Sequence, residues 1–325
     1  MANPRVSIIC NTYNHEKYIK DALESFINQK TNFDYEILVH DDASTDNTVN
    51  IVKEYEKKYP DLIKTIFQNE NKYSKGVSIM DIQLQRAKGK YLACCEGDDY
   101  WIDFNKLQLQ YDILEKNSEI NMVAHGVFIV KEDTKKVIGK ITPSENERIL
   151  NLEEVIAGGG GYIGTNSLFF RKSLLIPKPP LRKKMELDYT LQIVGALKGG
   201  IYYVPKVMSA YRSLSKGSWS VSMYSDVKKF VIFQDKMIDM LEFLNDSTNN
   251  KYEVIIRNTI KKTEFNKYLI MNDIKSLKSD KFKDLYYSFP LSTRIKIYIK
   301  KYLPFLKKIK DNFLYRGKKQ WNQEM

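Results

Sequence analysis

The chain has 325 residues, of which 43% are hydrophobic and 28% are charged, and this composition excludes a disordered, collagen-like or membrane-embedded protein. The net charge of +12 would suit an anionic partner such as nucleic acid, a membrane surface or a phosphorylated substrate. Residues 289–325 hold ten basic and two acidic side chains, so the other 288 residues carry only +4. Nucleic acid is therefore not expected as a partner, because phosphate contacts need clustered Lys and Arg on the main body.

The first hundred residues alternate between strand and helix patterns. Apolar, β-branched runs predict strands at residues 5–10, 35–41, 63–68 and 91–95. Apolar residues at helical spacing predict helices at residues 16–29, around 49–55 and at 77–87. This alternation predicts an α/β fold whose parallel sheet is covered by helices on both faces.

The second half of the chain is less regular. We expect strands at residues 122–130 and 165–171, a mobile loop at Gly158 to Gly161, a helix at residues 186–197 and an extended segment at residues 201–212. Beyond about residue 223 the pattern becomes helical and Lys-rich. We therefore predict two domains, an α/β domain at residues 1–220 and a helical, basic region at residues 221–325.

The cysteines and the hydropathy pattern bear on the cellular compartment. Cys10, Cys94 and Cys95 lie in apolar runs and form neither a disulfide framework nor a CxxC pair. We find neither a signal-peptide pattern at the N-terminus nor a run of about 18 apolar residues. The expectation is a cytoplasmic protein without a spanning helix.

Acidic residues follow two of the predicted strands. Asp41 and Asp42 end the second strand, and Glu96, Asp98 and Asp99 follow the fourth. Ligands of open parallel sheets bind beyond the carboxyl ends of the strands, so both acidic groups should meet in one crevice. Carboxylates with phosphate oxygens and water suit Mg²⁺ or Mn²⁺ better than zinc. The sequence motifs alone favour this ligand-binding role no more than the alternative, in which the acids are polar loop starts and helix caps.

The turn after the first strand contains an aromatic residue. Asn11, Thr12, Tyr13 and Asn14 stand where a dinucleotide fold would have GxGxxG, and no P-loop motif occurs. An aromatic ring in a polar turn can stack on a nucleobase. Taken alone, Tyr13 is more often a packing residue.

Four segments in order carry a resemblance to a known family. SIICNTYNHEKYI, VHDDASTDNT, AKGKYLACCEGDDYW and LDYTL make residues 4–215 resemble the inverting family 2 glycosyltransferases with the GT-A fold. That fold is a Rossmann-like, mixed but mostly parallel sheet flanked by helices. EGDDYW and the later YRSLSKGSWS are most similar to the branch that builds bacterial capsule, lipopolysaccharide and exopolysaccharide chains.

The resemblance implies a donor site. It assigns the nucleotide to Thr12, Tyr13 and Asp42, with Asp41 as a further contact, and Asp42 would accept a hydrogen bond from the base. The DxD motif of the family, which meets the metal and the sugar diphosphate, maps to Glu96 and Asp98. Since Glu replaces the usual first Asp, we assign the Mn²⁺ or Mg²⁺ ion to Asp98 and Asp99 and leave Glu96 as a donor contact.

The catalytic base implied by the resemblance is the Asp of an ED motif that opens a helix. Here the motif is interrupted and reads ELDYTL, so Asp188 is the predicted base and Glu186 the second candidate. As an isolated residue, Asp188 would be an ordinary first-turn carboxylate. Arg212, ahead of the polar run at residues 213–220, is predicted to pair with the diphosphate; a plain strand end explains it equally well. Gly158 to Gly161 would lie on the acceptor side, although a simple connection is the default.

The C-terminal tail has an amphipathic pattern. Apolar residues recur at helical spacing between Ile295 and Ile309, lysines fill much of the rest, and Pro304 is expected to kink the helix. Such a helix suits an anionic membrane interface. The alternative is a helix docked on the catalytic domain with a solvated polar face. The tail helices could also pair two copies into a homo-oligomer.

Together these features predict a metal-dependent inverting glycosyltransferase. It would move a hexosyl or N-acetylhexosaminyl group from a nucleotide-sugar, most simply a UDP-sugar, to a hydroxyl of a lipid-linked saccharide. The expected location is the inner face of the plasma membrane. Two alternatives stay open, a sugar-nucleotide pyrophosphorylase and a catalytically idle nucleotide-binding scaffold.

Overall fold

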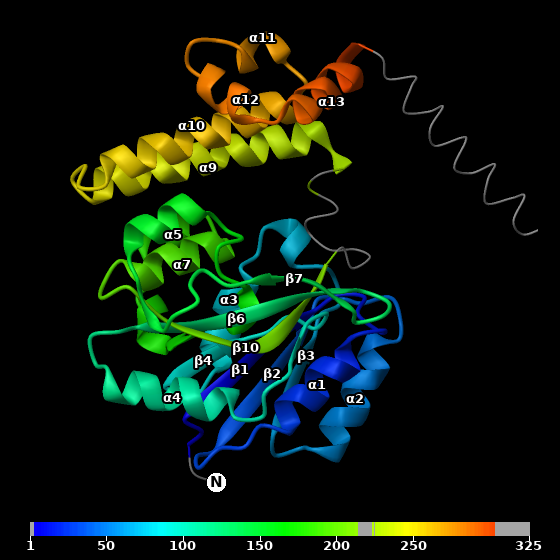
Figure 1. The fold of residues 1–325 in the computed structure, drawn as a ribbon. Coiled ribbons are helices and arrows are strands. Elements are labelled where there is room, and N and C mark those ends of the chain that lie inside the picture. Colours follow the sequence, from blue (N-terminus) through cyan, green and yellow to red (C-terminus); the bar gives the residue numbers. More distant parts are fainter. Residues whose placement is uncertain (1–2, 214–222, 224, 303–325) are drawn as a thin grey trace, which may run out of the picture. The chain divides into compact units, whose positions relative to one another are not determined.

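A computed structural model of the protein describes residues 3–213, 223 and 225–302 (Figure 1). The chain divides into two compact units, and the division falls between Ser222 and Met223. The boundary predicted from the change in composition lies near residue 220.

The first unit is built on a mixed sheet, for which ten strands are described. The main path runs β3-β2-β1-β4-β9-β6-β10-β5, with β7 paired to β6 and β8 to β10. Strands β1 to β4 pair in parallel, as do β6 and β10, whereas β9 lies antiparallel between β4 and β6. The sheet is thus mixed and mostly parallel. The strands are β1 Val6–Thr12, β2 Tyr35–Asp41, β3 Ile63–Phe67, β4 Tyr91–Cys94, β5 Tyr100–Trp101, β6 Met122–Lys131, β7 Val137–Ile141, β8 Arg148–Leu150, β9 Phe169–Arg171 and β10 Ile201–Ser213.

Helices cover both faces of this sheet because successive strand residues point to opposite faces, and nearly all residues of β1 and β2 are buried. One core joins Ile8, Ile37 and Val39 of the strands to Phe26 of α1 and Leu107 of α4. The helices α3 and α7 contact β2 and β10. The helices of this unit are α1 Ile19–Ile27, α2 Thr48–Lys58, α3 Ile79–Arg86, α4 Lys106–Lys116, α5 Leu152–Gly158, α6 Pro180–Lys184 and α7 Asp188–Ala196.

Two predicted elements differ from the observed ones. The strand expected at residues 165–171 begins as a 3-10 turn, Thr165–Ser167, and only Phe169–Arg171 pairs as β9. The turn forms because Ser167 N–H and its hydroxyl both donate to Gly164 O. The extended segment predicted at residues 201–212 forms β10 but is irregular at Pro205, where the pairing with β6 has register shifts between Val204 and Ser209.

The second unit consists of helices within the described residues. The two long helices, α9 Val227–Ser247 and α10 Glu253–Ile270, lie side by side (Figure 1). The short helices α11 Ile274–Leu277 and α12 Lys283–Ser288 precede α13 Leu291–Tyr302. A second core joins Phe265 of α10, Phe282 directly before α12 and Ile297 of α13. None of the described helices is long and apolar enough to cross a membrane.

Candidate functional site

The ends of β1 and β4 are locked together at the predicted crevice. The N–H of Gly97 donates to Asn11 O (2.9 Å), and the N–H of Asp42 donates to Thr12 O (3.0 Å). A Cβ on Gly97 would lie 2.8 Å from Thr12 Oγ1 and 3.0 Å from His15 Nδ1, so only glycine fits here. The acidic loop after β4 therefore lies directly on the turn after β1.

Glu96 lies within the electrostatic influence of two other carboxylates. Burial, then Asp188, then Asp98 raise the pKa of Glu96 to about 8. The opposing effect comes from a long hydrogen bond of 3.4 Å, which Asn11 Nδ2 donates to Glu96. Burial raises the pKa of the Cys94 thiol, and the charges of Glu96 and Asp188 raise it further. The predicted base therefore lies on the same side of the sheet as the acidic loop, although 90 residues separate Asp98 from Asp188 in the sequence.

Asp98 faces the turn after β1. Its Oδ2 lies 4.0 Å from His15 Nε2, and the two side chains are only 15% and 16% exposed. Burial lowers the pKa of His15, against the opposing charge of Asp98. Among the described residues, no group of three or more His, Cys, Asp or Glu side chains is arranged to hold a metal ion.

Asp99 points in another direction and is buried. Its Oδ1 accepts from the N–H of Arg212 (2.9 Å), and its Oδ2 accepts from Asn166 Nδ2 (3.0 Å). Burial and then the charge of Asp98 raise the pKa of Asp99. Both oxygens of Asp99 thus hold β10 and the 3-10 turn, and its role as a metal ligand stays a prediction.

Arg212 is also buried, at 1% exposure. Its guanidinium forms an ion pair with Asp21 of α1 and donates to the carbonyl of Asp98. The rings of Tyr18 and Tyr100 lie 5.2 and 4.6 Å from its central carbon. Pairing of Arg212 with a diphosphate stays a prediction, and these contacts give the side chain a structural role in this conformation.

The acid pair after β2 organises two neighbouring loops. Asp41 accepts from the N–H (2.9 Å) and hydroxyl (2.5 Å) of Ser44. Asp42 accepts from the N–H groups of Lys72 (2.8 Å) and Tyr73 (3.0 Å). Both carboxylates are buried. Both side chains therefore hold backbone groups of neighbouring loops, and their contact with a nucleotide stays a prediction.

The predicted nucleotide turn combines a buried hydroxyl with an exposed ring. Thr12 is buried, and its Oγ1 has no hydrogen-bond partner among the described residues. Tyr13 is 43% exposed, which leaves its ring accessible for stacking. These two residues lie next to Gly97 and Asp42, so the structure brings the predicted nucleotide turn and both acidic loops together.

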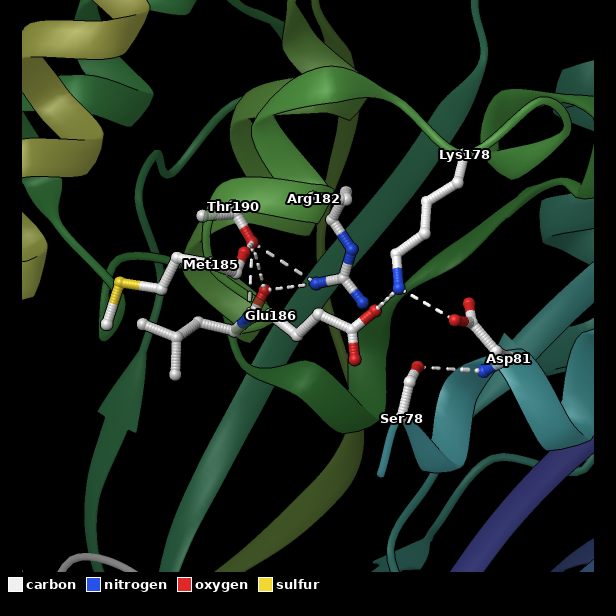
Figure 2. Close-up of polar contacts among 8 residues, drawn as sticks. Ser78, Asp81, Lys178, Arg182, Met185, Glu186 and Thr190 are labelled. Atoms are coloured by element: carbon white, nitrogen blue, oxygen red, sulfur yellow. Dashed lines mark hydrogen bonds and ion pairs between the residues drawn. The ribbon is translucent and has the colours of Figure 1, made fainter. Parts of the chain in front are cut away.

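Asp188 and Glu186 have different surroundings. Asp188 is exposed at the first turn of α7, and its Oδ2 accepts from Thr165 Oγ1 (2.5 Å). Glu186 forms an ion pair with Lys178, whose Nζ also lies 2.7 Å from Asp81 (Figure 2). Glu186 is thus engaged by a lysine whereas Asp188 is exposed, and the choice of Asp188 as the base stays a prediction.

The segment that carries Glu186 is fastened to α7. Arg182 is buried and donates through Nη1 to Leu187 O (2.6 Å) and Thr190 Oγ1 (3.2 Å), as Figure 2 shows. Thr190 in turn accepts from the N–H of Leu187 (3.1 Å). These bonds fix the start of α7, and with it the backbone of Asp188.

Sequence reasoning missed several residues at this site. His15 has no metal-ligand spacing to the other histidines in the sequence, but it lies in the same turn as Thr12. Thr165 and Asn166 fell inside a predicted strand. Lys178 carried no motif, since its partners are distant in the sequence. Only His15 had a usable signal, because any residue of a nucleotide-binding turn is a candidate.

The acids thus gather at the carboxyl edge of a mixed α/β sheet, which is where proteins of the open α/β class bind their ligands. Residues 7–175 match the model of the family described as "Glycosyl transferase family 2". The chain belongs to this family, and the resemblance noted from its motifs is confirmed.

Relatives and solved structures agree with this assignment. An uncharacterized protein of Mycobacterium tuberculosis is 36% identical over 225 residues, which cover 69% of this chain and 63% of that protein. A poly(ribitol-phosphate) beta-glucosyltransferase of Bacillus spizizenii is 34% identical over 111 residues, 31% of this chain and 17% of that one. The crystal structure of S. aureus TarS 1-349 in complex with UDP has a TM-score of 0.53 at 17% identity, covering 89% of this chain and 76% of that chain. The GT-A fold is thus confirmed.

Proposed function

We propose that the protein transfers a sugar from a nucleotide-sugar to a hydroxyl of a lipid-linked saccharide, with inversion at the anomeric carbon. The observation that carries this proposal is the convergence of Glu96, Asp98 and Asp188, in which two other carboxylates disfavour ionisation of Glu96. Crowded like charges are costly unless a cation or hydrogen-bond donors compensate them. A donor complex would supply that compensation.

The donor is best accounted for as a UDP-sugar. Two solved structures of S. aureus TarS are complexes with UDP and with UDP-GlcNAc, and both have a TM-score of 0.53 to this chain. Tyr13 supplies an exposed ring for the base and Thr12 a buried hydroxyl without a partner among the described residues. Asp42 and Asp41 hold the surrounding loops and keep one lone pair per oxygen for a ligand.

A divalent cation fits the acids of this crevice. Mg²⁺ in enzymes usually takes one or two carboxylates and completes its shell with phosphate oxygens and water. We assign this role first to Asp98, which faces the turn after β1, whereas Asp99 is buried against Arg212 and Asn166. When bound, Mn²⁺ or Mg²⁺ neutralises negative charge on the diphosphate leaving group. Glu96, next to Asp98 in the acidic loop, would contact the donor beside the ion.

Asp188 is the proposed general base. Its exposed carboxylate can accept the proton of an acceptor hydroxyl as that oxygen forms the new bond to the anomeric carbon. The bond to the diphosphate breaks on the opposite face of the sugar, so the configuration inverts. Holding the two reactants in line can contribute roughly 7 kcal/mol in favourable systems.

Membrane association is the proposal for the second unit. On α13, Leu291, Ile295 and Ile299 are spaced four residues apart and are 63%, 49% and 37% exposed. The basic excess of residues 289–325 accompanies this apolar row. An exposed apolar row with lysines suits the anionic inner face of the plasma membrane, where a lipid-linked acceptor lies. Leu303, Leu306, Ile309 and the Pro304 kink lie outside the described residues.

Nucleoside-diphosphate release tests the proposal. Wild-type protein with Mn²⁺ is assayed against UDP-GlcNAc, UDP-glucose, GDP-mannose and dTDP-rhamnose. Asp188→Asn should abolish turnover and leave UDP binding intact, whereas Asp98→Ala should weaken Mn²⁺-dependent UDP binding in calorimetry. An Asp188→Asn protein with near-normal turnover would remove Asp188 from this role. A wild type that binds UDP but turns over no donor would favour the idle scaffold. The pyrophosphorylase alternative gains no support from the family match.

A further inference from the structure

One short turn contacts both halves of the candidate site. The 3-10 turn Thr165–Ser167 holds Asp188 through Thr165 Oγ1 (2.5 Å) and Asp99 through Asn166 Nδ2 (3.0 Å). Adjacent residues of one turn thus grip the proposed base and the acidic loop.

The turn itself is rigidly mounted. Asn166 is 1% exposed, and its amide is fully used: Nδ2 also donates to Ala210 O (3.1 Å), and Oδ1 accepts from Ser209 Oγ (2.8 Å). The backbone carbonyl of Asn166 accepts from Trp101 Nε1 (3.0 Å). The carbonyl of Ser167 accepts from Gln110 Nε2 (2.8 Å). Strand β10, strand β5 and helix α4 therefore all fix this turn.

Asp188, by contrast, has little support of its own. Its side chain is exposed at the start of a helix, where a carboxylate has several rotamers. The hydrogen bond from Thr165 selects one of them and ties it to the rigid turn.

We propose that Thr165 and Asn166 are positioning residues that set the separation between the base and the donor loop. This inference rests on the proposed role of Asp188 as the base. In-line transfer needs the base and the leaving group at opposite sides of one carbon, and a displacement of about 1 Å can cost a hundredfold in rate. The turn fixes that separation because it contacts both sides through neighbouring residues.

The Thr165 half is tested with a matched set of variants of the full chain. With the donor that the wild type turns over among UDP-GlcNAc, UDP-glucose, GDP-mannose and dTDP-rhamnose, Thr165→Val should lower kcat roughly tenfold to a hundredfold. The KM for the donor should change by less than about twofold, because Thr165 does not hold the nucleotide. Thr165→Ser retains the hydroxyl and should restore kcat, and Thr134→Val, in an exposed turn, should behave as wild type.

The outcomes separate this inference from the proposed function. If Asp188→Asn is inactive but Thr165→Val has wild-type kcat, the positioning role alone is wrong. A Thr165→Ser protein as slow as Thr165→Val would also overturn it, since a role in packing would then explain both. If Asp188→Asn is active, or if the wild type turns over none of the four donors, the proposed function fails and the positioning role fails with it.

The Asn166 half is tested by exchanging two side chains. Asn166→Asp places a second buried carboxylate against Asp99 and should abolish turnover. The double variant Asp99→Asn/Asn166→Asp restores a donor and an acceptor between the two positions but leaves Ala210 O without its donor, so activity should recover in part, by about tenfold. No recovery in a double variant that melts like the wild type would overturn the positioning role of Asn166 and favour Asp99 as a metal ligand.

Discussion

Lys106 offers a quantitative test of the core beneath the acidic loop. Its side chain is 0% exposed, although lysine is almost never buried without an ionic partner. The Nζ donates to Gln110 Oε1 (2.7 Å) and lies 3.9 Å from the centroid of a ring of Trp101. Burial lowers the pKa of Lys106 to about 7, with small opposing effects from Cys95 and Cys94.

The sign of the pH dependence follows from this lowered pKa. Below pH 7 the folded and unfolded states both carry the proton, and the cost of burying the charge is fully present. Between pH 7 and the usual lysine pKa of 10.5, the folded state is neutral while the unfolded chain stays protonated, so stability rises with pH. Integration from pH 7 to pH 9 gives a gain of about 2 kcal/mol in the free energy of unfolding.

The perturbation is Lys106→Met, which keeps the volume and removes the titration. Urea unfolding of the first unit is followed at pH 7 and pH 9 for wild type and variant. The variant also loses the bond to Gln110 and the contact with the Trp101 ring. The part of these contacts that changes as Lys106 loses its proton is already contained in its lowered pKa, so the double difference between the two pH values measures the titration of Lys106. The reasoning would be refuted if the difference in the free energy of unfolding between wild type and variant were the same at pH 7 and pH 9. Lys106 would then keep its charge through the Trp101 ring.

Three further experiments test the turn at Gly97, the ion pair between Asp21 and Arg212, and the basic C-terminal segment. Gly97→Ala should weaken UDP binding in calorimetry by about tenfold or more, because the new methyl group would press on Thr12; unchanged affinity would separate this turn from the nucleotide. Asp21→Asn leaves the Arg212 guanidinium buried without its anionic partner and should lower the free energy of unfolding by about 2 kcal/mol, since Asp21 is one-third exposed; an unchanged melting temperature would count against it. Deletion of residues 289–325 should release the protein from anionic liposomes, and equal sedimentation of both proteins would contradict the membrane proposal.

The regular part of the fold could be predicted because its signals are local. Strand β2 matches its predicted range of residues 35–41, since an apolar run lies between two polar turns. Helix α4 was missed although it is long, because it buries Lys106 and Gln110 where a pattern assigns surface positions. The polar start of residues 165–171 became a turn through contacts with Trp101, Gln110 and Ser209. Those partners are distant in the sequence, so the hydropathy pattern of residues 165–171 contains no sign of these contacts.

The acids illustrate the same limit at the site. The sequence pattern placed five of them at one sheet edge, and the resemblance added Asp188 at a helix start; hydrogen bonding separates these six acids into two groups. Asp41, Asp42 and Asp99 accept from backbone N–H groups of nearby loops and hold those loops in place. In the other group, the charges of Asp188 and Asp98 raise the pKa of Glu96.

This separation has a geometric cause in the acidic loop. The N–H of Asp99 donates to Glu96 O (3.1 Å), which closes a tight turn, and the side chains of Asp98 and Asp99 leave this turn in different directions. Asp98 faces His15 in the crevice, while Asp99 faces the interior and receives the N–H of Arg212. The two neighbouring acids therefore do not present their oxygens to one point on the crevice side. Of the two neighbouring acids, Asp98 is the candidate metal ligand. Asp99 holds the loop that presents Asp98, because it accepts the hydrogen bond from the N–H of Arg212.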